Sequence, residues 1–307
     1  MSVIILKWFV QFGFVVIALL LVLTFFPGIT LLTTKVTTPF CPAWKIVRDT
    51  NLKRREESRA RELRAQSSIL AHEPDRNLWR TPHGDWWVPS DSDMILPFLL
   101  DQQERSIYRP VNAGEVVLDG GAHIGVFTRK ALDSGARLVV ALEPAPNAAE
   151  CYRRNFAKEI AAGRVILLEK GIWGFTGDLP LFVNGNGDAA NSFVTKFPTA
   201  QRVEHIAVIS IDEIVRSLNL NSLDMIKVDI KGATEEALRG AKNVLSGMHP
   251  RLSISTEDPP EDIVAIMNIL RPYGYRFEPG PCEVSKIEIR TNVLYAVPPQ
   301  GYDAQHR

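Results

Sequence analysis

Short apolar runs alternate with longer amphipathic segments through the C-terminal two thirds of the chain. The short runs, rich in Val, Ile and Leu, predict buried strands, and the longer segments predict helices. Strands are predicted at 115–118, 138–142, 165–168, 225–228, 252–255, 275–278 and 293–297, and helices at 124–132, 146–160, 234–245 and 261–270. Two more strands, 179–183 and 206–209, predict an inserted hairpin around loop 184–188. This order predicts an α/β domain over residues 111–299, with a doubly wound, mostly parallel sheet and an antiparallel strand near its C-terminal end.

The N-terminus has a different pattern, because the chain is uncharged from Trp8 to Phe26. A helix of this length crosses about 30 Å of hydrocarbon. A cleaved signal peptide is the alternative, but the apolar run is long for one, and Phe25–Gly28 lacks the small-x-small pattern of a cleavage site. We therefore predict an uncleaved transmembrane helix within residues 1–27.

A linker and a charged helix are predicted between this anchor and the rest of the chain, over residues 28–70. Prolines and threonines in 27–44 predict an extended connector. Residues 51–70 are rich in Arg and Glu and lack Gly and Pro, which predicts a solvated helix. The helix is either a spacer or a basic surface for anionic lipid headgroups, and its glutamates favour the spacer.

Residues 71–110 are predicted to form a cap before the α/β domain. The turn-rich segment 78–89 holds three of the six tryptophans. Their indoles either pack against the sheet edge or offer a flat apolar surface to a sugar or acyl substrate, and packing is the favoured interpretation. Residues 93–109 predict an amphipathic helix that covers one side of a ligand cleft.

The first strand of the α/β domain ends in an acidic residue and a glycine turn, Asp119-Gly-Gly-Ala-His-Ile-Gly125. Glycine allows positive φ and close approach of the backbone to a ligand. Glu143 ends the next strand, where a carboxylate can accept hydrogen bonds from ribose hydroxyls. No glycine here satisfies the G-x-G-x-x-G pattern of dinucleotide sites, which disfavours NAD. An adenosyl ligand without a pyrophosphate fits the pattern.

The turn resembles the first motif of class I S-adenosylmethionine-dependent methyltransferases, and the chain from about Asn112 to Val297 resembles the FkbM family of these enzymes. Four segments match the family in order: 111–128, 143–147 with Asn155, 210–214 and 224–241. The last contains Ile-Lys-Val-Asp-Ile-Lys-Gly-Ala-Thr, which is similar to the family run Ile-Lys-x-Asp-x-Glu-Gly-Ala-Glu. Members of the family mostly methylate hydroxyl groups of sugars, polyketides and other natural products.

The resemblance implies a fold, a cofactor and a set of cofactor-binding residues. The fold is that of class I methyltransferases, and the cofactor is S-adenosyl-L-methionine. The methionine half lies against Asp119 and the turn, and the ribose lies on Glu143. The cofactor-binding residues are then Asp119, Gly121, Ala122, His123, Ile124, Gly125, Glu143, Pro144 and Asn147.

Asp229 and Lys231 are the candidate catalytic residues. Asp229 follows the predicted central strand and can act as the base or orient the acceptor. Lys227 lies two positions before Asp229, so both side chains should face the same side of the sheet. Lys227 and Lys231 can lower the pKa of Asp229, which also weakens it as a base. The alternative for any Asp before a helix is an N-cap. Lys231 and Thr234 replace two carboxylates of the family pattern, and His123 stands where Asn is common.

Charge balance and cysteine content limit which partners and which cellular compartment the sequence predicts for this protein. The 35 Lys and Arg residues balance the 35 Asp and Glu residues, so no net field favours nucleic acid. The three cysteines lie far apart, which argues against a disulfide framework or a zinc site, and no metal motif is visible. Reduced thiols and the soluble cofactor favour the cytosol, as does the excess of Lys and Arg after the apolar segment.

These patterns predict a single-pass membrane protein whose catalytic domain is cytoplasmic, with residues 300–307 as a tail. The predicted activity is S-adenosylmethionine-dependent O-methylation of a small-molecule, glycan or lipid-linked hydroxyl acceptor. One alternative is a non-catalytic, membrane-tethered module that binds the cofactor, and another is a dehydrogenase-like protein, disfavoured by the glycine spacing. The oligomeric state stays open.

Overall fold

The computed structural model describes residues 35–36, 41, 43–104, 107–184, 200–230, 232–256, 263–284 and 288–299. The predicted transmembrane helix, most of loop 184–188, Lys231 and the tail 300–307 lie outside these residues. Within them, no helix is both long enough and apolar enough to span a bilayer. The chain forms two compact units, one from residues up to Arg54 together with Pro281–Thr291, and a larger one from Arg55–Gly280 and residues after Thr291.

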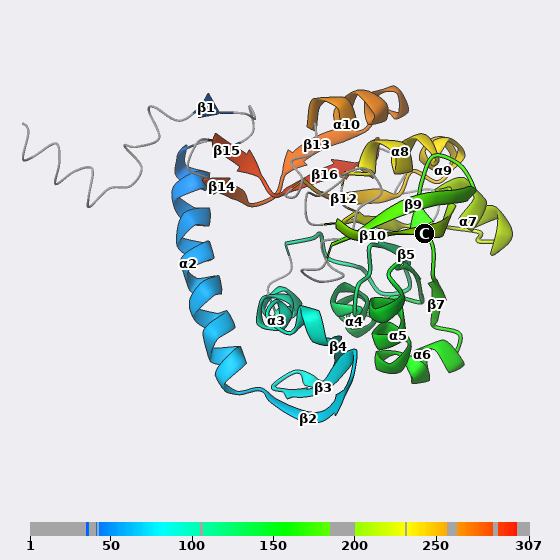
Figure 1. Cartoon of the computed structure of the whole chain (residues 1–307). Helices are drawn as coiled ribbons and strands as arrows, with labels where there is room; N and C mark the ends of the chain where they lie inside the picture. Colours follow the sequence, from blue (N-terminus) through cyan, green and yellow to red (C-terminus); the bar gives the residue numbers. More distant parts are fainter. Residues whose placement is uncertain are drawn as a thin grey trace, which may run out of the picture. The chain divides into compact units, whose positions relative to one another are not determined.

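A seven-stranded sheet forms the centre of the larger unit (Figure 1). Its strands, in spatial order, are β13 (Arg276–Pro279), β16 (Val293–Val297), β12 (Arg251–Ser255), β11 (Met225–Val228), β5 (Val116–Gly120), β6 (Leu138–Leu142) and β7 (Val165–Leu168). The five strands from β12 to β7 are parallel, and β16 is antiparallel to both of its neighbours. The predicted doubly wound sheet with an antiparallel strand near the C-terminal end is confirmed.

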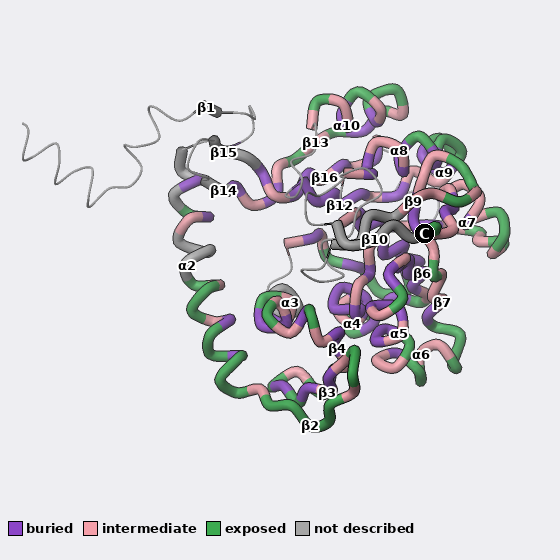
Figure 2. Tube along the Cα trace, in the orientation of Figure 1, coloured by how far each residue is buried: buried purple, intermediate pink, exposed green. Residues whose placement is uncertain are grey.

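Helices cover both faces of this sheet. The crossovers from β5 to β7 contain α4 (Val126–Asp133), α5 (Pro146–Asn155) and α6 (Ala157–Ala161). Those from β11 to β13 contain α8 (Thr234–Arg239), α9 (Lys242–Gly247) and α10 (Ile263–Leu270). Since the strand order reverses between β5 and β11 and crossovers are right-handed, the two sets lie on opposite faces. The central strands are buried on both sides (Figure 2), as expected for a parallel sheet.

Two helices predicted as single elements are each broken in two. The segment 146–160 divides at Phe156, whose side chain is fully buried. The segment 234–245 divides at Gly240, where a Cβ atom would overlap the carbonyl oxygen of Trp173. In both cases close tertiary packing overrides a continuous helical pattern.

The cap is a three-stranded antiparallel sheet followed by a helix. Its strands are β2 (Ser68–Glu73), β3 (Arg76–Thr81) and β4 (Gly84–Pro89), so the segment predicted as turn-rich is a hairpin. Trp79 and Trp86 are buried, and Trp79 Nε1 donates to Asp93 at 2.7 Å. These contacts support the packing interpretation of the tryptophans. The predicted helix 93–109 is shorter and runs as α3 (Leu96–Glu104), after the 3-10 helix η2 (Ser90–Ser92).

The charged helix and the inserted hairpin also form, with shifted bounds. The helix α2 (Ala43–Ala65) begins earlier than predicted and ends before β2. The hairpin consists of β9 (Gly177–Asn184) and β10 (Ala200–Ile209). The short strand β8 (Gly171–Ile172) pairs with the other edge of β10. Helix α7 (Ile211–Ser217) follows, and Ser210 Oγ caps it by accepting from Glu213 N at 3.2 Å.

The smaller unit contradicts the prediction that the thiols are reduced. Cys41 and Cys282 form a disulfide whose Cα atoms are 6.0 Å apart, within the range that such a bond requires. Cys282 lies on β14 (Cys282–Val284), which pairs with β15 (Glu288–Thr291), and β15 pairs with β1 (Lys35–Val36). Asp49 accepts from Cys282 N at 2.8 Å. The spacing of the cysteines was misleading because tertiary structure joins residues 241 positions apart.

Removing this cross-link is expected to destabilise the protein. Cys282→Ala should lower the free energy of unfolding by about 2–4 kcal/mol, because the unfolded chain regains the freedom that the disulfide removes. Thermal unfolding of the full chain without reductant measures the effect, and reduction of the wild type should reproduce it. Unchanged unfolding in both cases would contradict the prediction.

Candidate functional site

The candidate site lies where β5 and β11 end side by side. The sheet order reverses between these strands, and ligands of open α/β sheets bind at the carboxyl ends of strands at such a point. The turn after β5 has positive φ at Gly121 (72°), His123 (49°) and Gly125 (94°). A Cβ atom on Gly121 would overlap the carbonyl oxygen of Asp229, and one on Gly125 would overlap the ring of Phe156. Both glycines are therefore needed for the path of the turn.

Gly121→Ala is expected to damage both folding and ligand binding. The substitution should cost more than Gly163→Ala, a matched control with φ of 69° where nothing lies within 4 Å of an added Cβ. The control should cost about 1 kcal/mol for its left-handed backbone alone. Denaturant unfolding of both variants checks this difference, and equal costs would show that the turn can move away from β11.

Glu143 holds this turn in place. Its Oε2 accepts from His123 N at 2.8 Å, and its Oε1 accepts from Ala145 N at 2.9 Å. The residue is 7% exposed. Each carboxylate oxygen has further acceptor capacity, so the same group can orient the turn and receive ribose hydroxyls. Pro144 follows Glu143 directly, Asn147 lies in the first turn of α5, and both are partly exposed.

A buried ion pair lies beneath the turn. Asp119 on β5 and Lys227 on β11 are register partners, and Lys227 Nζ lies 3.1 Å from Asp119 Oδ1. Lys227 also donates to Gly121 O at 2.7 Å, and Thr128 Oγ1 donates to Asp119 Oδ2 at 2.8 Å. The Asp119 side chain is fully buried. Asp119 thus supports the floor of the site, and its direct contact with a methionine group stays a prediction.

His123 carries two buried ring nitrogens. Neither Nδ1 nor Nε2 has a hydrogen-bond partner among the described residues, although part of the residue is exposed. Burial is the main cause that lowers the pKa of His123 from 6.5 to about 4; the charge of Lys227 acts in the same direction, and the charge of Asp229 opposes it. The imidazole is therefore neutral at pH 7 and offers one donor and one acceptor to a ligand.

This histidine should make stability depend on pH between about 6.5 and 4. The unfolded chain binds a proton in that range and the folded chain does not, so the contribution of His123 is complete above pH 6.5 and is lost as the pH falls toward 4. His123→Asn should be less sensitive to acid than the wild type. Urea unfolding at pH 7 and pH 4.5 tests this, and parallel losses in both proteins would contradict it.

Asp229 follows β11 directly, and its side chain is 36% exposed. Its Oδ2 lies 4.0 Å from Lys227 Nζ, so the two residues share a side of the sheet as predicted. Tyr108 Oη donates to the same oxygen at 2.9 Å. Tyr108 could not be recognised from the sequence, because no motif surrounds it.

The structure brings most of the predicted site together. The turn 121–125 and Glu143 meet at the end of β5, and Asp229 N donates to Gly120 O at 2.9 Å. Thr234 is buried in the first turn of α8, and Lys231 lies outside the described residues. The two ring nitrogens of His123 have no hydrogen-bond partner among the described residues. Together with the glycine turn, they fit a ligand that brings its own polar groups, as an adenosyl sulfonium does.

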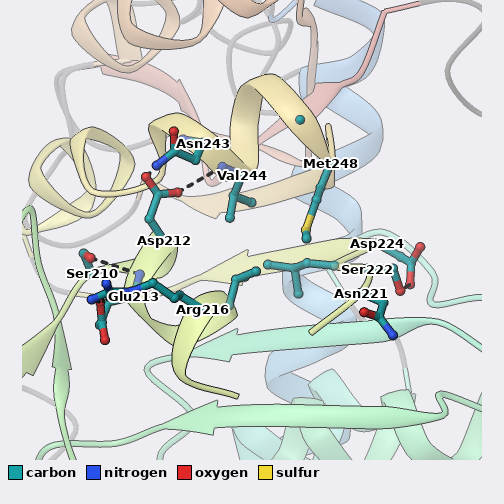
Figure 3. A pocket seen from close by; sticks show the side chains of 13 residues that line it. Ser210, Asp212, Glu213, Arg216, Asn221, Ser222, Asp224, Asn243, Val244 and Met248 are labelled. Carbon is teal, nitrogen blue, oxygen red and sulfur yellow. Dashed lines mark hydrogen bonds and ion pairs between the residues drawn. The ribbon is translucent and has the colours of Figure 1, made fainter. Parts of the chain in front are cut away.

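A cavity of about 860 Å³ lies at the other end of β11 and is not this site (Figure 3). Two of its carboxylates are engaged by the backbone: Asp212 accepts from Asn243 N and Val244 N at 3.0 and 2.9 Å, and Asp224 accepts from Val116 N at 2.8 Å. Such bonds fix helix α9 and strand β5. We therefore assign these acids a structural role.

The family follows from a match between the sequence and a family model. The model of the methyltransferase FkbM domain matches residues 119–277, which is more than half of the chain. The chain belongs to this family. The match runs from Asp119, at the end of β5, through Glu143 and Asp229 to β13. No curated protein sequence matches the chain.

Several solved structures resemble this FkbM domain protein. Methyltransferase FkbM from Methylobacillus flagellatus KT has a TM-score of 0.45 and 18% identity, covering 79% of this chain and 59% of its own. This chain thus spans little more than half the length of that protein. TYW2 of M. jannaschii in complex with AdoMet has a TM-score of 0.41 and 17% identity, covering 75% of this chain and 88% of its own.

Proposed function

We propose that this FkbM domain protein transfers the methyl group of S-adenosyl-L-methionine to a hydroxyl group of a glycan, lipid-linked or other small acceptor. The observation that carries the proposal is the placement of the Asp229 carboxylate beside a glycine turn that Glu143 holds in place. Family membership supports methyl transfer. The hydroxyl acceptor is supported by Asp229 alone, because a hydroxyl must lose a proton during transfer and Asp229 is a carboxylate partly open to solvent.

The residues divide into three roles in this proposal. Glu143 accepts hydrogen bonds from the ribose, and the turn 121–125 lies against the methionine half. The bound cofactor supplies a methyl group on a positively charged sulfur, which needs no further activation. Asp229 orients the acceptor and receives its proton, while Lys227 and Asp119 hold the floor of the site.

The test is methyl transfer by the full chain. Formation of S-adenosylhomocysteine is measured with a panel of sugars, glycolipids and polyketide-like alcohols, for the wild type and for Asp229→Asn. The proposal expects turnover with at least one hydroxyl acceptor and a loss of about 100-fold or more in the variant. Transfer only to nitrogen or carbon acceptors would overturn the O-methyl assignment.

A non-catalytic module that binds the cofactor is the alternative, favoured by Thr234 in place of a family carboxylate. Thr234 is 1% exposed and its Oγ1 has no hydrogen-bond partner among the described residues. Cofactor binding without turnover by any acceptor in the panel would support this alternative. Thr234→Glu, which restores the family residue, should then give activity.

We also propose that the N-terminal apolar segment, Trp8–Phe26, tethers the domain to a membrane, a proposal supported by its sequence alone. The cytoplasmic orientation rested partly on reduced thiols, and the disulfide removes that support, because disulfides persist in oxidising compartments. Protease treatment of intact vesicles with the cytoplasmic face outward decides on which side of the membrane the FkbM domain lies. Protection of the domain from the protease would place it on the oxidising side, and digestion would place it in the cytoplasm.

A further inference from the structure

The segment Ile107–Arg109, here called the strap, lies across a row of polar side chains on the central sheet. The row is formed by register partners on adjacent strands, Asp119, Lys227, Ser253 and Tyr295. Side chains at the same register position project from the same face of a sheet. The row therefore crosses four strands at one level, just below the carboxyl ends where the site lies.

Each residue of the strap is tied to this row. Tyr295 Oη donates to Ile107 O, and Arg109 N donates to Ser253 Oγ at 3.1 Å. The Arg109 guanidinium lies 4.6 Å from the centre of the Tyr295 ring. Lys227 Nζ lies 5.5 Å from the centre of the Tyr108 ring. These contacts fix the strap on the sheet at both of its ends.

Tyr108, in the middle of the strap, is held by packing on one side and by a carboxylate on the other. It is 7% exposed, and its ring meets Phe127 of α4 edge to face, with centroids 5.5 Å apart. A buried phenol requires a hydrogen-bond partner. Its partner is Asp229 Oδ2, at 2.9 Å. The strap thus places the Tyr108 hydroxyl as a hydrogen-bond donor to Asp229. In the proposed function, Asp229 is the carboxylate that orients the acceptor and receives its proton.

We propose that Tyr108 is a positioning residue of the methyl-transfer reaction, which fixes the Asp229 carboxylate for the acceptor hydroxyl. The inference rests on the proposed function. As the acceptor oxygen forms its bond to the methyl carbon, the bond from carbon to sulfur breaks with its electron pair on sulfur, and the hydroxyl proton passes to Asp229. The phenol of Tyr108 holds one oxygen of that carboxylate, which limits rotation of the group.

The strap lies before the region that matches the family model, residues 119–277. Its link to Asp229 therefore joins a segment outside the matched region to a residue inside it. A purely structural role for Tyr108 is the competing explanation, because the ring fills space between Phe127 and Lys227. Tyr108→Phe separates the two roles, since it keeps the ring and removes only the hydroxyl.

The matched control is Tyr295→Phe. It also removes a phenol hydroxyl bound to the strap, but that hydroxyl is bonded to Ile107 O and not to Asp229. Asp229 is faced by Lys227 on β11, by Tyr108 on the strap and by His123 on the turn. Only the Tyr108 variant changes a direct donor to the carboxylate, so only this variant should change how the carboxylate titrates.

The experiment measures turnover, cofactor affinity and the titration of Asp229 in the full chain. Tyr108→Phe should lower kcat roughly tenfold or more relative to the wild type. Its calorimetric affinity for S-adenosylhomocysteine should stay within about twofold of the wild-type value. In a plot of kcat against pH, the acidic limb should move to higher pH. The limb should move upward because loss of a donor disfavours the charged carboxylate. Tyr295→Phe should leave that limb unchanged.

A readout independent of turnover keeps the two proposals apart. The carboxylate of Asp229 is followed by NMR in protein labelled with 13C at aspartate, and assigned with Asp229→Asn. Its titration midpoint should be higher in Tyr108→Phe than in the wild type or in Tyr295→Phe. The same midpoint in all three proteins would overturn the role of Tyr108. A higher midpoint in Tyr108→Phe, without transfer to any hydroxyl by the wild type, would support the hydrogen bond from Tyr108 to Asp229 but refute the proposed function.

Discussion

Lys227→Met is expected to lower the free energy of unfolding by about 3–5 kcal/mol, the cost of leaving a buried charge without its partner. Asp119 is fully buried, and the Lys227 side chain is 5% exposed. Lys227 also donates to Gly121 O, so its loss removes a bond to the turn as well. Chemical unfolding of the full chain measures the effect.

The control for this prediction is the double variant Lys227→Met with Asp119→Asn. It removes both charges, so most of the lost stability should return, because a pair replaced as a whole costs less than a pair that is broken. The substituted side chain, an amide, would keep an oxygen that accepts from the hydroxyl of Thr128, which donates to Asp119 Oδ2 in the wild type. A loss below about 1 kcal/mol in the single variant would show that water reaches the ion pair.

Glu143→Ala is expected to weaken the binding of S-adenosylmethionine and S-adenosylhomocysteine by at least about 100-fold, which corresponds to about 2.7 kcal/mol. Each hydrogen bond to a charged group contributes about 1.5–3 kcal/mol. The variant would lose the proposed ribose contacts and also releases His123 N and Ala145 N. Calorimetric titration of the full chain measures the affinity.

Glu143→Gln separates the two roles of this residue. Glutamine keeps one oxygen that can accept from a backbone amide, so it should preserve more of the turn than alanine does, while losing the charge. Thermal unfolding of both variants shows whether the fold survives. Undiminished affinity in a folded Glu143→Ala protein would refute the cofactor site and the function built on it.

The central sheet could be predicted from the sequence because its strands are short apolar runs that end in an acid or a turn. The run 165–168 is predicted at the bounds that the structure shows. Parallel strands buried on both faces produce such runs, which need no knowledge of their partners. The cap sheet was not predicted because β2 is almost wholly exposed, so its side chains do not show the alternation of a half-buried strand.

The parts of the site that were not predicted depend on partners distant in sequence. The spacing of two positions between Lys227 and Asp229 indicated a shared side, but the pairing of Lys227 with Asp119 depends on the register between β11 and β5. Tyr108 reaches Asp229 across 121 positions. The cysteines 241 positions apart illustrate the same point. Spacing predicts contacts within an element, whereas contacts between elements follow from topology.

The disulfide between Cys41 and Cys282 turns most of the chain into a covalent ring. Every residue from Arg55 to Gly280, and with them the glycine turn, Glu143 and Asp229, lies inside that ring. One proteolytic cut within the ring would therefore release no fragment while the disulfide is intact. A nicked molecule would keep its full mass on a non-reducing gel and separate into two pieces only after reduction, and any N-terminal tether would hold both pieces until then.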